Sequence, residues 1–137
     1  MYIVLDDNAF MPEKAHEEDA GFDLKTPIDF TVLPHSNIII DTGVHIEIPR
    51  HYAGLLVSKS GLNVKYNITS TGLIDCGYTG SIRVKLYNNG SIEKQFLRGD
   101  KISQLVLIKI AEDVKLIPVD FLNDTSRGDN GFGSSGR

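Results

Sequence analysis

Cysteine is almost absent from this 137-residue sequence, which contains only Cys76. A single cysteine excludes an intrachain disulfide and cannot build a cysteine-based zinc site. Because no histidine lies near it in the sequence, we interpret Cys76 as a small, semi-apolar filler rather than as a nucleophile. The histidines also lack a metal-ligand spacing such as His-x-x-x-His; they are His16, His35, His45 and His51.

Long apolar runs are missing as well, and nothing in the sequence approaches the length of a membrane span. The N-terminus does not show the basic region and apolar stretch of a secretory signal. We therefore expect a cytoplasmic protein without a membrane partner, in a reducing compartment.

An excess of basic residues is absent too, since 14 lysines and arginines face 18 acidic residues, for a formal net charge of −4. Tight, sequence-independent binding of nucleic acid needs a basic surface, so we expect no nucleic-acid partner. A polyphosphate can still bind, but through local donors and a metal ion rather than through the overall charge. The length fits one domain with a real core.

Sustained helical periodicity is also missing, and strand patterns dominate. Residues 44–48 and 82–86 alternate apolar and polar side chains, which is the period of a half-buried strand. Continuous apolar runs at 38–40, 55–57 and 105–108 are typical of strands covered on both faces. Many short strands separated by turns predict an all-β subunit with a jelly-roll-like distorted barrel.

Two local signals and a change of composition complete this outline. Residues 88–91, Asn-Asn-Gly-Ser, predict a β-hairpin turn, and a short turn after Ser60 is the only helical candidate. From Asn123 on, glycine becomes frequent and apolar residues almost vanish, so this end cannot bury enough surface to order itself. We expect a barrel domain at residues 1–122 and a flexible, glycine-rich arm at residues 123–137.

The segment at residues 70–80, STGLIDCGYTG, is the most informative part of the sequence. A strand that carries Leu73 and Ile74 into the core would present Asp75 at its exposed end. The glycines around Tyr78 would let the backbone turn tightly beside a ligand. An acid, a flat ring and an open backbone edge suit a site that holds a small ringed substrate and deprotonates a water. An aspartate that ends a strand and a core tyrosine are the structural alternatives.

Four further segments support this interpretation. They are AGFDL at 20–24, SKSGL at 58–62, RGDKISQL at 98–105 and RGDNGFGSSG at 127–136. In this order and at these intervals, the five segments resemble the five motifs of the trimeric deoxyuridine triphosphatase (dUTPase) family. The resemblance covers nearly the whole chain, from about Ala20 to the C-terminus.

The resemblance implies a homotrimer with shared active sites and Mg²⁺-dependent hydrolysis of dUTP to dUMP and pyrophosphate. Water would attack the α-phosphorus, and Asp75 would position and activate that water as the catalytic base. Asp23 would lie near the metal and act through water, although a turn-forming or salt-bridged aspartate is the alternative. The Asp75 segment would come from one subunit and the glycine-rich tail from another. Gly77 stands where the family usually has a second aspartate.

The same resemblance implies a set of substrate-binding residues. Tyr78 would pack against the sugar and reject a 2′-hydroxyl, while main-chain groups around residues 67–72 would read uracil. Lys59 stands where the family usually has arginine, which leaves its contact with phosphate open. The base would be covered by Phe132 or, less favoured, by Phe96. The full set is Lys59, Ser60, Gly61, Thr69, Gly72, Ile74, Tyr78, Gln104, Arg127, Phe132, Gly133, Ser134 and Ser135.

Two other functions stay open at this point. The dCTP deaminases share the architecture, although we find no glutamate placed beside the proposed base pocket to activate water at a cytosine ring. A nucleotide-sensing interaction module would keep the pocket, with catalysis secondary, and would have an unknown protein partner. The tail by itself is equally typical of a disordered terminus. Asp100, which follows Gly99, is predicted to cap a turn through its side chain.

Overall fold

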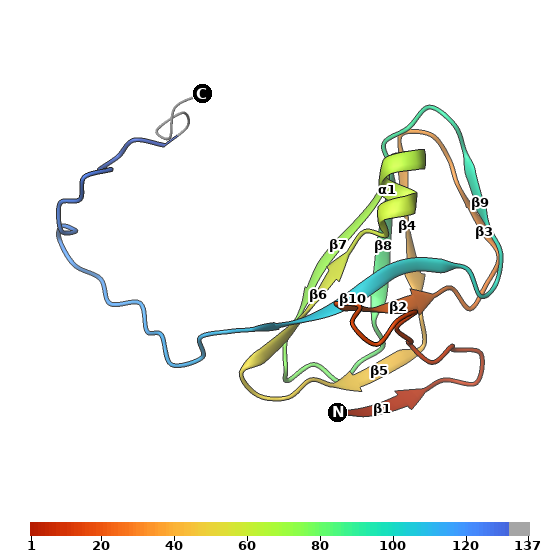
Figure 1. Ribbon diagram of the computed structural model, residues 1–137, viewed down its shortest axis with the longest axis horizontal. Helices are drawn as coiled ribbons and strands as arrows, with labels where there is room; N and C mark the ends of the chain where they lie inside the picture. Colours follow the sequence, from red (N-terminus) through yellow and green to blue (C-terminus); the bar gives the residue numbers. More distant parts are fainter. Residues whose placement is uncertain (132–137) are drawn as a thin grey trace.

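The protein is described by a computed structural model that covers residues 1–131. Short strands and one helix form the body of the molecule, and an extended segment leaves it after the last strand (Figure 1). The elements are β1 (Tyr2–Leu5), β2 (Gly21–Lys25), β3 (Phe30–Val32), β4 (Ser36–Asp41), β5 (Val44–Glu47), β6 (Tyr52–Val57), α1 (Ser60–Tyr66), β7 (Ile68–Ile74), β8 (Arg83–Asn88), β9 (Lys94–Phe96) and β10 (Lys101–Lys109).

The largest sheet has six strands in the order β2-β10-β6-β7-β8-β4. Two smaller sheets pair β1 with β5 and β3 with β9, and all of these pairings are antiparallel. The non-consecutive strand order shows that crossovers bring distant parts of the chain together as neighbours in this sheet. The predicted all-β class is confirmed. No helix in residues 1–131 is both long enough and apolar enough to cross a membrane.

The core forms because successive side chains of a strand point to opposite faces. In β8, Val84 and Leu86 are 0% and 1% exposed, and in β5 the alternate positions Val44 and Ile46 are buried in the same way. Burial of each aliphatic side chain of this size contributes about 1.5–3 kcal/mol. Ile39 is 59% exposed, so the prediction that its apolar run is covered on both faces is wrong for the single chain.

The predicted hairpin at residues 88–91 is also wrong. β8 pairs with β7 and β4, whereas β9 pairs with β3, so the turn carries the chain from one sheet to another. The buried side chain of Asn88 explains the change: its Nδ2 donates to the carbonyl oxygens of Val32 at 3.2 Å and Ile92 at 2.8 Å. The backbone N–H of Gly90 donates to Asn88 Oδ1, which closes the turn locally.

The other two local predictions are confirmed. The turn after Ser60 is α1, which ends where Asn67 takes a left-handed conformation and its N–H donates to the carbonyl oxygen of Asn63. The side chain of Asp100 accepts the backbone N–H of Leu97 at 2.8 Å, and so caps the turn before β10.

The chain leaves the sheet at Lys109, and residues 113–131 are exposed without helix or strand. Figure 1 shows this extended segment running away from the body. The extended part thus begins before residue 123, and the division into a domain of residues 1–122 and an arm stays a prediction. Six apolar side chains of the segment are 63–97% exposed, namely Val114, Leu116, Ile117, Val119, Phe121 and Leu122.

Candidate active site

Asp75 lies directly after β7, with an exposed side chain, as the strand interpretation predicts. Ile74 before it is 9% exposed and joins the core, whereas Leu73 is 63% exposed and faces away, so its predicted burial is wrong. Four residues of the predicted site, Gly72, Ile74, Asp75 and Tyr78, line one cavity of about 250 Å³, which we call the Asp75 pocket. Its lining is Leu56, Gly72, Leu73, Ile74, Asp75, Tyr78, Ser81, Ile82 and Arg83.

Tyr78 is placed at this pocket by a turn, in which its backbone N–H donates to the carbonyl oxygen of Asp75 at 3.0 Å. The ring is 46% exposed, so the alternative of a core tyrosine is wrong. Its hydroxyl donates to the carbonyl oxygen of Ser81 at 3.0 Å. A Cβ atom at Gly80 would lie 2.5 Å from the Tyr78 hydroxyl oxygen, so this ring position requires glycine there. The pocket therefore offers an exposed carboxylate and a half-exposed ring.

A second group of functional side chains, which we call the lysine cluster, consists of Asp23, Lys59, Lys101 and Gln104. The carboxylate of Asp23 has a 5% exposed side chain and binds both ammonium groups, Lys59 Nζ at 2.5 Å and Lys101 Nζ at 2.7 Å. Burial raises the pKa of Asp23, but the hydrogen bonds from Lys101 and Lys59 outweigh it, and the net pKa is lowered. Asp23 is therefore the salt-bridged aspartate of the alternative interpretation.

Gln104 joins this cluster through the sheet register. On β10 it lies opposite Asp23 of β2 and opposite Val57 of β6. Its Nε2 donates to the carbonyl oxygen of Ser58 at 3.1 Å, one residue before Lys59. The two lysines exceed the one aspartate within the cluster, while Glu13 and Asp19 lie near enough to Lys101 to help Asp23 raise its pKa. The two ammonium groups are the part of this end of the sheet that suits an anionic ligand.

Ser60 and Gly61 follow Lys59 as the first two residues of α1. Apart from its chain neighbours and the backbone of α1, no atom of the described residues lies within 4 Å of the position that a Cβ of Gly61 would take, so a ligand can approach this backbone closely. The structure thus brings the predicted phosphate-binding residues Lys59, Ser60, Gly61 and Gln104 to one end of the sheet.

The two groups lie at opposite ends of the stretch over which β6 and β7 pair. Gly54 pairs with Ile74 next to Asp75, while Val57 at the other end pairs with Thr71 and leads into Lys59. Three strand steps alone span about 10 Å. Within one chain, the predicted base and the predicted phosphate ligands are therefore not adjacent.

The remaining predicted residues lie apart from both groups. Thr69 is on the far half of β7, where its hydroxyl accepts Asn89 Nδ2 at 3.2 Å. Arg127 lies in the extended segment, and its Nε donates to the carbonyl oxygen of Asn130. Phe96 is 2% exposed and stacks on Phe30 with ring centroids 4.8 Å apart, so it cannot cover a base. The other tail positions, Phe132, Gly133, Ser134 and Ser135, lie outside the described residues.

The carboxylate of Asp23 is not placed to act as a direct ligand of a metal ion. Both carboxylate oxygens already bind ammonium groups, and these positive charges oppose a divalent cation at the same oxygens. Among residues 1–131, no group of three or more histidine, cysteine, aspartate or glutamate side chains is placed to hold a metal ion. Magnesium also binds through substrate phosphates and retained water, which needs no carboxylate cage.

Two further residues near these groups were not predicted. Lys101 is the first residue of β10 and precedes Ile102, which does not distinguish it from any solvated strand residue. Glu112, at the root of the extended segment, accepts the backbone N–H of His51 at 2.7 Å and lies 3.8 Å from the sulfur of Cys76. The hydrogen bond from His51 lowers the pKa of Glu112. Both partnerships join residues far apart in sequence, so no local pattern indicates them.

Comparison with known proteins identifies the family. Residues 7–136 match the family described as dUTPase. The chain is 41% identical over 133 residues to the deoxyuridine 5′-triphosphate nucleotidohydrolase of Clostridium novyi, with 95% of this chain and 93% of the relative covered. The enzyme of the same name from Eremothecium gossypii is 34% identical over 131 residues, with 95% and 86% covered.

Solved structures give the same result. The dUTPase of Staphylococcus bacteriophage 80alpha with dUPNHPP has a TM-score of 0.91 and 30% identity, and the match covers 99% of this chain and 98% of the other. A mutant dUTPase of the S. aureus phage phi11, reported with a structural Mg(II) ion, has a TM-score of 0.80 and 30% identity over 88% and 96% of the two chains. The chain belongs to the dUTPase family, which confirms the predicted fold and family.

Proposed function

We propose that this chain is a dUTP diphosphatase, in which Asp75 acts as the base in hydrolysis of dUTP to dUMP and pyrophosphate. The observation that carries the proposal is the Asp75 pocket, where the exposed acid and the Tyr78 ring meet in a chain that matches the dUTPase family over residues 7–136. The cavity of about 250 Å³ is of the right order for a nucleoside and too small for the whole triphosphate.

In this mechanism Asp75 accepts a proton from a water molecule, whose oxygen forms a bond to the α-phosphorus as the bond to the pyrophosphate oxygen breaks. General-base assistance of this kind is worth about 10²- to 10⁴-fold in rate. The rest of the acceleration comes from holding the triphosphate in line and balancing its charge. Tyr78 packs on the deoxyribose, where a 2′-hydroxyl would collide with the ring.

The lysine cluster binds the triphosphate. Lys59 has a 27% exposed side chain and Lys101 a 43% exposed one, so both remain accessible to a ligand while Asp23 holds them. Lysine supplies a point charge without the two-pronged geometry of arginine. The substrate is the Mg²⁺ complex of dUTP, in which the ion neutralises part of the phosphate charge. Asp23 then acts by placing the lysines, and at most through water on the ion.

We further propose a homotrimer with shared active sites. Two features of the single chain support an assembly. The Asp75 pocket and the lysine cluster lie at opposite ends of the stretch over which β6 and β7 pair, which supports a site that a second copy completes. The extended segment carries exposed apolar side chains, among them Leu116 at 97% and Phe121 at 83%, which need a neighbouring surface to cover them. Nineteen extended residues, 113–131, reach about 60 Å, far enough for the tail to serve a neighbour's site.

A second candidate function is nucleotide sensing, with a protein partner. The 80alpha dUTPase, which is similar over nearly the whole chain, is described among phage dUTPases that control transfer of virulence genes. That finding concerns the phage protein, and it supports nucleotide sensing here only because the two chains are similar in sequence and structure. The named nucleotidohydrolases among the relatives favour the diphosphatase over a dCTP deaminase. A cytoplasmic location is part of the proposal.

The test is to incubate the pure protein with each deoxynucleoside triphosphate and Mg²⁺ and to follow pyrophosphate release. We expect rapid release from dUTP and little from the other nucleotides. Tight binding of dUTP with negligible turnover would favour the sensing module, and ammonia release from dCTP would favour the deaminase. Sedimentation equilibrium on the same sample tests the trimer.

A further inference from the structure

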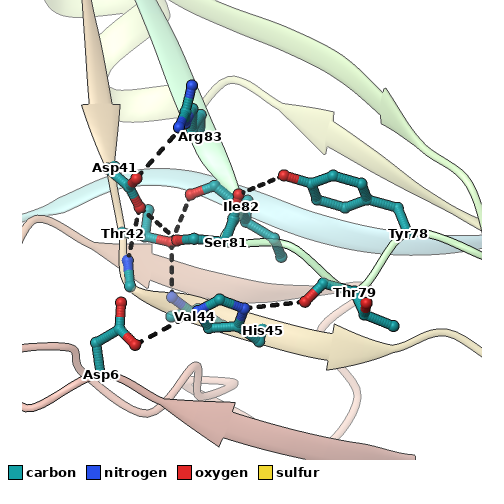
Figure 2. Close-up of polar contacts among 11 residues, drawn as sticks. Asp6, Asp41, Thr42, Val44, His45, Tyr78, Thr79, Ser81, Ile82 and Arg83 are labelled. Carbon is teal, nitrogen blue, oxygen red and sulfur yellow. Dashed lines mark hydrogen bonds and ion pairs between the residues drawn. The ribbon is translucent and has the colours of Figure 1, made fainter.

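The loop that follows Asp75 is tied at its end to the turn between β4 and β5 (Figure 2). The hydroxyl of Ser81 donates to the carboxylate of Asp41. The hydroxyl of Thr42 donates to the carbonyl oxygen of Ile82 at 2.7 Å. Since Thr42 is fully buried, this anchor is part of the core and fixes where β8 begins.

His45 of β5 holds the middle of the same loop at Thr79. Its Nδ1 lies 2.9 Å from the carbonyl oxygen of Thr79, and its Nε2 lies 3.4 Å from Oδ1 of Asp6 (Figure 2). A carbonyl oxygen can only accept a hydrogen bond, so Nδ1 carries the proton in this arrangement. Thr79 directly follows Tyr78, and the Tyr78 hydroxyl donates to the carbonyl oxygen of Ser81. The Tyr78 ring is thus held by a hydrogen bond from its own hydroxyl and by the hydrogen bond of His45 to the backbone of the next residue, Thr79.

We propose that His45 is a positioning residue for Tyr78, and that its hydrogen bond to Thr79 keeps the ring in the orientation that selects deoxyribose over ribose. The inference rests on the proposed function, in which Tyr78 packs on the sugar. Without the donor, the loop between Asp75 and Ser81 gains conformations, and only a fraction of the molecules present the ring correctly. The apparent affinity for substrate falls by that fraction, while the bound complex reacts as before.

The second ring nitrogen makes this contact sensitive to pH. When both nitrogens are protonated, His45 donates to Thr79 and to Asp6 at once. When Nε2 loses its proton, its lone pair faces the Asp6 carboxylate, and the tautomer with the proton on Nε2 gives up Thr79. The hydrogen bond to Thr79, and to a lesser extent the charge of Asp6, raises the pKa of His45 above its ordinary value of 6.5.

The charged groups around His45 come from several elements. Asp41, at the end of β4, also raises the pKa of His45, by less than Asp6 does. Nε of Arg83, in β8, lies 3.5 Å from Oδ2 of Asp41. Glu47 lies two residues along β5, on the same side of the strand as His45. The loop at residues 76–81 brings no charged side chain of its own. The surroundings are thus mainly acidic, which favours the protonated ring.

Two substitutions separate the hydrogen bond from the charge. In His45→Asn, the amide Nδ2 takes the place of Nδ1 and can still donate to Thr79, but it does not titrate. In His45→Val, the donor is lost while the strand preference of β5 is kept. We expect His45→Val to raise KM for dUTP by about 2- to 10-fold, the worth of one hydrogen bond at the surface of the protein. Its kcat for dUTP should change much less, and its preference for dUTP over UTP should fall.

The asparagine variant should keep the KM that the wild type shows while His45 is protonated. It should lose the rise of KM with pH that the deprotonation of His45 causes in the wild type. In the wild type, KM should rise as the pH passes upward through the raised pKa of His45. Because the substrate phosphates titrate equally in all samples, the comparison of profiles isolates the histidine. The exposed His16, replaced by glutamine, is the matched control and should leave KM and its profile unchanged.

Three results would overturn the proposal. One is equal KM values for the valine and asparagine variants. Another is a wild-type KM for dUTP that does not rise as the pH passes upward through the pKa of His45 measured by ¹⁵N NMR, a test that needs no variant to fold. The third is Tyr78→Ala that lowers the preference for dUTP over UTP while His45→Val does not. A Tyr78→Ala variant with an unchanged preference would instead remove the sugar-packing role of Tyr78, and the inference with it.

Discussion

The ammonium nitrogen of Lys59 lies 2.5 Å from Oδ1 of the buried Asp23. Resemblance to the dUTPase family leads one to expect arginine at this position and a metal-oriented role for the aspartate. In this chain the two residues form an ion pair, and Lys101 binds the other carboxylate oxygen at 2.7 Å. The aspartate therefore holds two cations in place, and under the proposed function these lysines bind the triphosphate.

Loss of the Lys59 charge should weaken substrate binding. For Lys59→Met, which keeps the length of the side chain, we expect KM for dUTP to rise by about 10-fold or more, as for loss of one hydrogen bond to a charged group. The exposed Lys109, replaced by methionine, is the control and should have no such effect. Steady-state kinetics at two salt concentrations checks this, because the wild type should lose more affinity in salt than Lys59→Met. Equal KM values for the wild type and Lys59→Met would show that Lys59 does not bind phosphate.

Asp23→Asn should destabilise the fold, with a definite pH dependence. The folded-state pKa of Asp23 is lowered below its ordinary value of 3.8, because the lysine hydrogen bonds outweigh burial. Its ionisation therefore contributes stability that is fully present above that value and is lost as the pH falls through the lower, folded-state pKa. Urea denaturation of both proteins should show a difference of about 2 kcal/mol near neutral pH, reflecting one hydrogen bond to a charged group, and a smaller one in acid. A difference that persists unchanged in acid would contradict the charged pair.

Asp75→Asn should abolish most turnover and spare binding. We expect kcat to fall by about 10²- to 10⁴-fold, since asparagine cannot take a proton from water. Calorimetric binding of a non-hydrolysable dUTP analogue should change little, and the exposed Asp7→Asn serves as the control. Near-normal turnover would remove Asp75 from the role of base.

The exposed apolar residues of the extended segment should hold the assembly together. Replacing Leu116 and Phe121 by aspartate should shift the protein toward smaller species, because charges would then occupy positions that a neighbour covers. The control is Lys115→Ala, in the same segment and exposed. Analytical ultracentrifugation checks the result, and an unchanged mass for the double variant would place the assembly contacts elsewhere.

A shortened chain should distinguish the role of the tail in catalysis from any role in the stability of the fold. Ending the chain at Ser126 keeps every strand and removes the glycine-rich tail. We expect the thermal midpoint to stay near that of the full chain and turnover to fall steeply, because the nucleotide would no longer be covered. Full activity of the shortened protein would identify the tail as a simple disordered terminus.

The sequence predicted those features that depend on near neighbours. Alternation at 44–48 and 82–86 indicated strands, and β5 and β8 lie there. The change from apolar residues to Asp75 indicated an exposed acid at a strand end, and Asp100 after Gly99 indicated a capped turn. In each case the physical cause, side-chain alternation or a local hydrogen bond, acts over a few residues.

Other expectations failed where distant segments compete. The Asn-Gly pair at residues 89 and 90 favours a hairpin by itself, but Asn88 finds better partners in Val32 and Ile92. The apolar run before Asp75 predicts that Leu73 is a core residue, yet the pleat of β7 places it outside once Ile74 is buried. Neither outcome can be deduced without knowing which strands become neighbours.

By itself, the sequence determined an all-β chain with its acid at a strand end, and the order of five motifs that marks the dUTPase family. Only the tertiary structure decided that Asp23 binds two lysines, that His45 reaches Thr79, and that the pocket and the lysine cluster lie at opposite ends of the stretch where β6 and β7 pair. The physical reason is that strand register across a sheet is set by burial of the whole core, and this register fixes which distant side chains can touch.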